Sequence, residues 1–353
     1  MINIQFKKVK EIVSDGNQIT IDCYELSPFR ILMMGASGTG KTTLLACMYE
    51  DFINKEFEKF SFASNDGIDE GKTRKKLDNQ LKQLLKKVED LKHGEQYTDE
   101  RQQIAPSASS QQYFFQGIKS KPATFHHKEF WYPVIFQDIP GEWYTDYDEQ
   151  NEAELTKKVE SADAYMYCID TPALMSGEYT HKKFNDASRI HSWLVTAARN
   201  ELLKNKSIIF ILSRSEKWRE DENRIIREFE EKYSNTIDLL RTAGATVYVT
   251  PVYSLGGVQF VKYNENEYPV YEKTGDRKSG KCSDPLIQML HDGMAMYEKK
   301  LQRINRKTKI KISNKLGITH FDIAEECARE LKDMMNCLRN KNIVVHSRNP
   351  AKK

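Results

Sequence analysis

Residues 35–42, Gly-Ala-Ser-Gly-Thr-Gly-Lys-Thr, have the composition and spacing of a loop that binds phosphate groups. Glycines let successive backbone N–H groups point at phosphate oxygens, the lysine reaches the β- and γ-phosphates, and the hydroxyl after it is placed to bind Mg²⁺. We therefore predict that the chain binds a nucleoside triphosphate, with Lys41 as a catalytic cation and Thr42 as a metal ligand. The residues expected to contact the nucleotide are Gly35, Ser37, Gly38, Thr39, Gly40, Lys41, Thr42 and Thr43.

The residues around this loop predict the elements that such a loop needs. Residues 29–34 are apolar except for Arg30 and predict a buried strand that feeds the loop, and residues 43–49 predict a helix that leaves it. The helix begins at the loop and adds the positive end of its dipole to the anion site. Strand, loop and helix in this order are the context that a phosphate-binding loop requires.

A second run, residues 131–142, ends in groups suited to Mg²⁺ and the γ-phosphate. Its apolar part predicts a strand that ends in Asp138, whose carboxylate could hold the water shell of Mg²⁺ opposite the loop hydroxyl. Gly141 could bring its backbone N–H against the γ-phosphate without a side chain in the way. Glu142 is the second predicted catalytic residue, because it could orient the attacking water or accept its proton. The alternative for Glu142 is an exposed acid with no catalytic part.

With these two motifs the chain resembles the translation-factor-like (TRAFAC) class of P-loop GTPases. Within that class it looks most like the bacterial double-GTPase domains associated with anti-phage conflict systems. The resemblance rests on residues 35–43, on residues 138–142 and on the strand order between them, and it covers roughly residues 28–260. It implies a switch loop ahead of the second motif, carrying a hydroxyl that reaches Mg²⁺. Where the family usually has threonine, the candidates here are Ser109 and Ser110.

The part of the chain that would read the base departs from the family pattern. GTPases use an N/T-K-x-D element, whose aspartate accepts two guanine N–H groups and whose lysine lies over the ring, whereas residues 213–216 are Ser-Arg-Ser-Glu. Arg214 keeps a cation, and Glu216 keeps the carboxylate with one extra methylene. The resemblance also implies that Ser254 lies in the loop that closes over the base. Guanine recognition by these three residues is expected, with an ordinary surface loop or adenine binding as the alternatives.

The rest of the chain alternates strands with helices. Residues 3–26 predict a β-hairpin around an Asp-Gly-Asn turn, and residues 111–118 and 129–137 predict two strands joined by a turn. Further strands are predicted at 164–169, 207–212 and 246–249, and further helices at 150–162, 182–203 and 222–243. This alternation predicts an α/β fold, a mainly parallel P-loop NTPase sheet flanked by helices. Nucleotides bind such sheets beyond the carboxyl ends of the strands.

Two segments are predicted as helical additions to this sheet. Residues 67–103 are polar and predict a helical insertion, with a leucine-rich stripe spaced four, three, four and three at Leu77, Leu81, Leu84, Val88 and Leu91. This spacing fits a short coiled-coil seam or a helix packed on its own domain. The chain from residue 284 onward looks helical, and its last dozen residues are expected to form a basic, frayed tail. We divide the chain into a hairpin (1–27), a GTPase-like domain with the insertion (28–283) and a helical extension (284–353).

The composition describes a soluble globular protein, with 39% hydrophobic and 30% charged residues and a formal net charge of +3. No apolar run approaches the length of a membrane span and the N-terminus lacks a signal-peptide stretch, so we expect a cytoplasmic protein without membrane contact. The nearly balanced charge gives no argument for a nucleic-acid partner. The six cysteines and eight histidines show no metal-ligand spacing, and reduced core thiols are expected.

Three functions remain open at this point. The leading prediction is a Mg²⁺-dependent switch that binds and hydrolyses GTP, in which residues 104–112 and 138–150 order around GTP and are released in the GDP state. The alternatives are an ATPase of similar architecture and a nucleotide-dependent scaffold with negligible hydrolysis. In each case we expect a protein partner at the switch loops, the helical insertion or the C-terminal helices.

Overall fold

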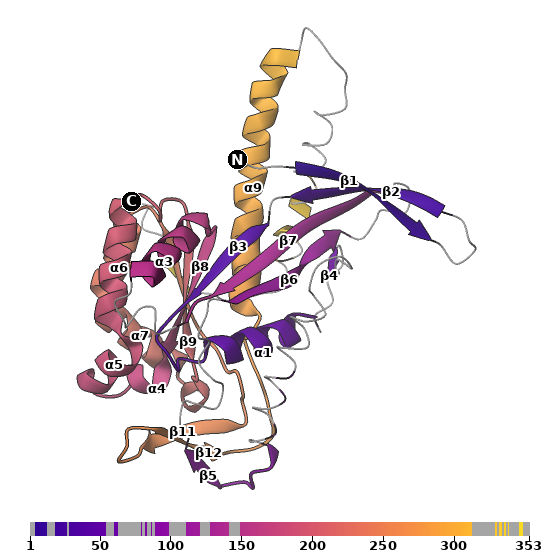
Figure 1. The fold of residues 1–353 in the computed structure, drawn as a ribbon. Helices are drawn as coiled ribbons and strands as arrows, with labels where there is room; N and C mark the ends of the chain where they lie inside the picture. The colour runs from indigo at the N-terminus through magenta and orange to yellow at the C-terminus, as the bar shows by residue number, and fades with distance from the viewer. Residues whose placement is uncertain are drawn as a thin grey trace.

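The computed structural model contains a central sheet with helices on both of its faces (Figure 1). A long helix, α9 (Asp284–Ile312), runs along one face and past the sheet. The structure describes residues 4–12, 18–26, 28–53, 60–62, 89–98, 111–120, 128–140, 149–312 and 346–348, and single positions at 79, 82, 86, 329, 332, 333, 335, 336 and 338.

Five parallel strands form the centre of this sheet. In spatial order they are β7 (Lys128–Asp138), β3 (Phe29–Met34), β8 (Ala164–Asp170), β9 (Ser207–Ser213) and β10 (Thr246–Pro251). β3 leads into the phosphate loop, with β7 on one side and β8 on the other. The strand order reverses at β3, and in open α/β sheets ligands bind beyond the strand ends at such a point. The predicted α/β fold with a mainly parallel sheet is confirmed.

Antiparallel strands extend the sheet at its edges. β6 (Gln111–Ser120) pairs with β7, β4 (Phe60–Phe62) pairs with β6, and β13 (His346–Arg348) pairs with β10. β1 (Ile4–Ile12) and β2 (Gln18–Leu26) form the predicted hairpin, and β2 also runs parallel to the start of β7. The expectation of a frayed tail is wrong for residues 346–348, because they form β13 and pair with β10.

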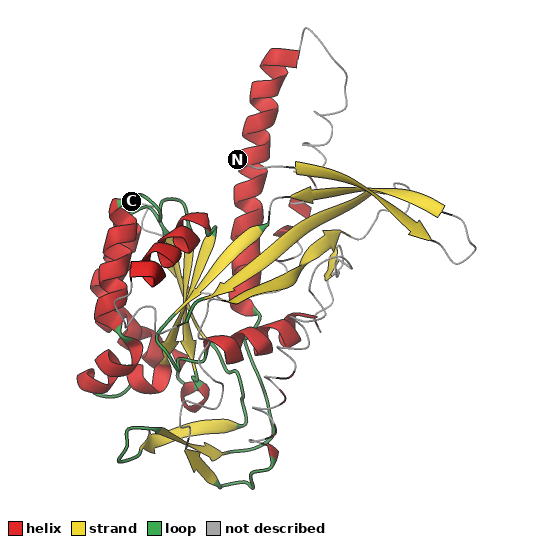
Figure 2. Ribbon diagram, viewed as in Figure 1, coloured by secondary structure: helices red, strands yellow, loops and turns green. Residues whose placement is uncertain are grey.

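The face of the sheet that carries α1 (Lys41–Ile53) and α9 holds one of two apolar cores (Figure 2). Successive side chains of a strand point to opposite faces, so Ile31 and Met33 of β3 belong to this core. The helices contribute a stripe of large apolar side chains at Leu44, Leu45, Met48, Leu286, Ile287, Leu290 and Met294. The helix that follows the phosphate loop is therefore anchored by burial rather than by its own helix propensity.

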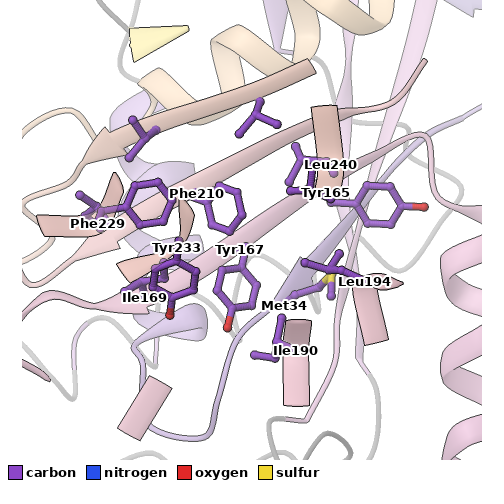
Figure 3. Packing of buried hydrophobic residues seen from close by; sticks show 14 of the residues in the cluster. Met34, Tyr165, Tyr167, Ile169, Ile190, Leu194, Phe210, Phe229, Tyr233 and Leu240 are labelled. Carbon is purple, nitrogen blue, oxygen red and sulfur yellow. The ribbon is translucent and has the colours of Figure 1, made fainter. Parts of the chain in front are cut away.

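The opposite face packs against α3 (Glu149–Ser161) and the helices that follow β8 and β9. Figure 3 shows the aromatic part of this second core, where Tyr167 and Phe210 of the sheet meet Phe229 of a helix and Tyr233, which directly follows that helix. The Phe210 and Phe229 ring centres lie 4.9 Å apart, and those of Phe229 and Tyr233 lie 5.0 Å apart. Contacts of this kind between aromatic rings add specific geometry to apolar burial.

Both of the longer predicted helices on this face are interrupted. The region predicted as one helix at 182–203 contains α5 (Glu178–Asn185) and α6 (Ala187–Arg199), separated by Asp186 with a φ of 44°; a short α4 (Thr171–Leu174) precedes them. The predicted helix at 222–243 is likewise α7 (Glu222–Lys232) and α8 (Ser234–Thr242). Both breaks coincide with tertiary contacts: Asn185 forms hydrogen bonds with Asp170 at the end of β8, and Tyr233, between α7 and α8, is buried.

A second, three-stranded antiparallel sheet was not predicted. Its order is β11 (Val258–Tyr263), β12 (Pro269–Lys273) and β5 (Gln96–Thr98). β5 lies within residues 67–103, so the helical insertion predicted there ends earlier than expected, although the described positions 79, 82, 86 and 89 are helical. Of the predicted leucine stripe, only Leu91 lies among the described residues.

No helix among the residues described for this chain is both long enough and apolar enough to span a membrane.

Candidate functional site

The phosphate loop turns between β3 and α1 through three glycines. Gly35, Gly38 and Gly40 have φ values of 140°, 76° and 86°. A Cβ on Gly35 would lie 2.6 Å from the carbonyl oxygen of Cys168 on β8, which is closer than real side chains approach. Glycine is therefore required at this position both by the backbone angle and by the neighbouring strand.

Lys41 begins α1 and its ammonium group lies against the backbone of the loop. Its Nζ donates hydrogen bonds to the carbonyl oxygens of Gly35 at 2.8 Å and Ala36 at 3.0 Å, and the residue is 8% exposed. The N-terminal end of α1 adds a partial positive charge at the same place. The loop, the lysine and the helix end thus form one site suited to anionic phosphate groups.

Thr42 and Asp138 meet at the place predicted for the metal. β7 runs beside β3 with Asp138 opposite Met33, which brings the carboxylate to the loop. Thr42 Oγ1 donates to Asp138 Oδ2 at 3.2 Å, and Asp138 is buried. A hydroxyl and a carboxylate are the oxygen ligands that Mg²⁺ takes from proteins, with water and substrate phosphate completing its shell. These two residues fit a Mg²⁺ ion.

Ser213 connects the segment that was predicted to read the base to the phosphate loop. Its hydroxyl donates a hydrogen bond to the carbonyl oxygen of Thr39, at 2.7 Å. The carbonyl oxygen of Ile169 lies 2.9 Å from the same hydroxyl oxygen. Sequence reasoning placed Ser213 in the base motif and gave it no role. Because β9 ends at this residue, the pairing of β9 with β8 brings the motif to the loop.

Arg214 has a left-handed backbone, with a φ of 58°, and its side chain lies beside the phosphate loop. A Cβ on Gly40 would be 3.9 Å from Arg214 Nε. The guanidinium Nη1 lies 3.3 Å from Asp170 Oδ1, in an ion pair whose carboxylate side chain is fully buried. The structure therefore brings the predicted base-covering cation to the predicted phosphate site.

Glu216 binds, through one carboxylate oxygen, the loop that was predicted to close over the base. Its Oε1 accepts hydrogen bonds from the backbone N–H groups of Leu255 at 3.1 Å and Gly256 at 3.3 Å, and burial raises the pKa of Glu216. The neighbouring Ser254 is buried, and its carbonyl oxygen accepts from Cys47 Sγ at 3.2 Å. Glu216 thus contacts the loop that contains Ser254, through hydrogen bonds that the sequence did not predict.

Asp170 is a residue of this site that sequence reasoning missed. Asn185 holds its backbone, accepting from Asp170 N at 2.8 Å and donating to Asp170 O at 3.1 Å. Asn185 Nδ2 in turn lies 3.2 Å from Nδ1 of His181, whose pKa burial lowers to about 4, so the neutral ring accepts this bond. An acidic residue that ends a buried parallel strand is a signal that could have identified Asp170.

The structure brings together most, but not all, of the predicted site. The phosphate-loop residues, Asp138, Arg214, Glu216 and Ser254 surround the carboxyl ends of β3, β7, β9 and β10. Within the loop Ser37 is exposed, and Thr43 on the first turn of α1 is half-buried. Ser109, Ser110, Gly141 and Glu142 lie outside the described residues.

Fold and site together define a P-loop nucleotide-binding domain. A parallel sheet carries a glycine-rich phosphate loop at the reversal of its strand order, with a lysine, a hydroxyl and a buried carboxylate at one end of the site. Residues 213–216 and 254–256, which contact one another, lie where the base was predicted to bind. This is the arrangement that a triphosphate with an attached base requires.

Residues 126–248 match the model of the Double-GTPase 2 family. The matched stretch contains β7 with Asp138 and the base motif at 213–216, and the phosphate loop lies before it. This match supports a P-loop GTPase domain of the double-GTPase type.

Among solved structures, the chain is similar to one from the "Signal recognition particle receptor SRb-GTP/SRX complex from Chaetomium thermophilum". The two sequences are 12% identical, the match covers 65% of this chain and 92% of that chain, and the TM-score is 0.35. A search of curated proteins found no match.

Proposed function

We propose that this chain binds GTP with Mg²⁺ between the phosphate loop and the base-closing loop, and that it hydrolyses GTP slowly as a molecular switch. The observation that carries the proposal is the contact of 3.2 Å between the Thr42 hydroxyl and the Asp138 carboxylate, next to Lys41. A hydroxyl and a carboxylate in contact beside the phosphate loop are the oxygen ligands that a nucleotide-bound Mg²⁺ takes from a protein.

Each residue would have a defined task. Lys41 and the backbone N–H groups of the loop would stabilise charge on the transferring phosphoryl group. Thr42 and Asp138 would hold Mg²⁺, which supplies charge neutralisation at the phosphate oxygens. Gly141 would offer a backbone N–H to the γ-phosphate, and Glu142 would orient the attacking water.

Replacing Glu142 tests whether the protein is a hydrolase. Since positioned acid–base groups contribute about 10²-fold or more, Glu142→Ala should slow single-turnover GTP hydrolysis about a hundredfold. The affinity for GTP should not change, because the residue would serve the water and not the nucleotide. Glu220→Ala, which removes an exposed acid, is the control. If Glu142→Ala hydrolyses GTP at the wild-type rate, Glu142 is an acid of the switch loop without a catalytic role.

Glu216 would recognise the guanine base, and Arg214 and Ser254 would assist it. Glu216→Gln keeps one oxygen for the Leu255 and Gly256 amides but replaces the other by an NH₂ group, which cannot accept from guanine. Leaving guanine donors unpaired costs about 1–3 kcal/mol, so GTP affinity should fall roughly tenfold or more, with little change for ATP. Calorimetric titration with both nucleotides measures this. Equal losses for both would make Glu216 a support of the loop alone and favour the ATPase alternative.

The finer assignments are proposals that rest on the sequence and on the resemblance. We place the domain in the TRAFAC class and the protein in the cytoplasm, and we propose a role in bacterial anti-phage defence. Ser109 or Ser110 would supply the switch hydroxyl for Mg²⁺. A protein partner would read the GDP and GTP states at the switch loops, the 67–103 segment or the C-terminal helices.

A further inference from the structure

The second sheet contacts the base-reading end of the nucleotide site. The guanidinium carbon of Arg214 lies 5.9 Å from the centre of the Tyr271 ring on β12. The same guanidinium pairs with Asp170, whose Oδ2 lies 3.4 Å from the hydroxyl of Tyr263 on β11. Arg214 is therefore held by the end of a main-sheet strand and by a side chain of the second sheet.

These contacts are shielded from water. The Arg214 side chain is 19% exposed, the Asp170 side chain is 0% exposed, and Tyr271 is 4% exposed. Cation–π and ionic contacts are stronger where water is excluded. Together they restrict the orientation of a guanidinium that would otherwise rotate freely at a loop.

The guanidinium is also close to the bound phosphates of the proposed function. Arg214 Nε is 3.9 Å from a Cβ built on Gly40, and the preceding Ser213 donates to Thr39 of the same loop. A base attached to a triphosphate in the loop would lie within reach of Arg214. Guanidinium groups stack on aromatic faces, which a lysine ammonium cannot do in the same planar way.

Tyr97 links the 67–103 segment to this cluster. β5 pairs with β12 so that Tyr97 lies opposite Tyr271, and the two rings stack with centres 5.6 Å apart and planes 25° apart. Residues 96–98 of the segment predicted as an insertion therefore pair with the strand that carries Tyr271, and Tyr97 stacks on the ring that contacts Arg214.

We propose that Tyr271 is a positioning residue that determines base affinity: with Asp170 it holds the Arg214 guanidinium against one face of a purine base. Tyr97 stacks on the Tyr271 ring, which would make β5 a part of the nucleotide site. The inference rests on the proposed nucleotide binding and adds the second sheet to it. Loss of the Tyr271 ring should weaken contacts to the base and leave contacts to the phosphates unchanged.

Two probes separate base contacts from phosphate contacts. Calorimetry would measure binding of GTP and of inorganic tripolyphosphate, both with Mg²⁺, to the full chain. Tyr271→Leu should lower GTP affinity about tenfold, the scale of a buried cation–π contact, and change tripolyphosphate affinity by less than about twofold. Tyr271→Phe keeps the ring and should bind GTP as the wild type does. Tyr268→Leu, in the turn between β11 and β12, is the matched control.

A double-mutant cycle tests whether the effect passes through Arg214. In an Arg214→Ala background, Tyr271→Leu should cause no further loss of GTP affinity. Additive losses, or equal losses for GTP and tripolyphosphate, would overturn the inference. If the wild type prefers ATP, only the proposed GTP specificity is overturned. In that case a loss of ATP affinity in Tyr271→Leu would still support the positioning role of Tyr271. Unchanged ATP affinity would overturn that role.

Discussion

Lys41→Ala is expected to reduce affinity for GTP by about 100-fold or more. The side chain places a cation against the phosphate loop, where Nζ lies 2.8 Å from the Gly35 carbonyl oxygen. Hydrogen bonds to charged groups contribute about 1.5–3 kcal/mol each, and the lysine is positioned to make more than one to the β- and γ-phosphates. Titration of the variant with GTP and Mg²⁺ measures the loss.

The fold should survive this substitution, because alanine is the best helix former and Lys41 is the first residue of α1. Unchanged thermal unfolding would confirm that the loss belongs to the site. Lys204→Ala, which removes an exposed lysine with a side chain 60% accessible, should bind GTP normally. Equal GTP affinity in Lys41→Ala and the wild type would count decisively against the phosphate site.

Asp138→Asn is expected to remove most of the gain in GTP affinity that Mg²⁺ provides. The carboxylate lies 3.2 Å from the Thr42 hydroxyl, and the substitution removes its charge while keeping its shape. Because metal affinity depends on carboxylate charge, we expect about a tenfold or larger loss when Mg²⁺ is present. With EDTA in place of Mg²⁺, variant and wild type should bind GTP alike.

Asp238→Asn on α8 serves as the control, since its side chain is 74% exposed and pairs with Arg241 of the same helix. Titrations of the three proteins with and without Mg²⁺ give the metal-dependent part directly. If Asp138→Asn retains the full Mg²⁺ dependence, the assignment of the metal to Thr42 and Asp138 is wrong.

The phosphate end of the site could be predicted because its residues are adjacent in the chain. The glycine spacing dictates the backbone angles at Gly35, Gly38 and Gly40, and the apolar run before them dictates a buried strand. The position of the Asp138 carboxylate could be predicted in the same way, because an apolar strand that ends in aspartate brings the carboxylate to the end of the sheet where the loop lies. Local composition was enough for both.

The base end could be predicted only in part, because distant residues assemble it. Arg214 and Tyr271 are 57 positions apart in the chain, and no periodicity relates a loop after β9 to a strand of another sheet. The carboxylate of Glu216 was expected to face a base, whereas its Oε1 also bonds Leu255 and Gly256. Such contacts follow from packing and not from spacing.

Short strands and helix breaks were missed for a related reason. β5 and β13 have three residues each, lie in polar or basic segments, and depend on pairing with β12 and β10. Tertiary contacts override local propensity at such places. Replacing the whole 67–103 segment by a linker would therefore also remove β5 and its Tyr97.

The central claim, a GTP site between the phosphate loop and the base-closing loop, is tested most directly by competition on the wild-type protein. A fluorescent GTP analogue bound in the presence of Mg²⁺ would be displaced by unlabelled GTP and, separately, by ATP. We expect GTP to displace it at a concentration at least about ten times lower than ATP, the factor that about 1.4 kcal/mol of base discrimination provides. Displacement by ATP at the lower concentration, or by neither nucleotide, would contradict the account.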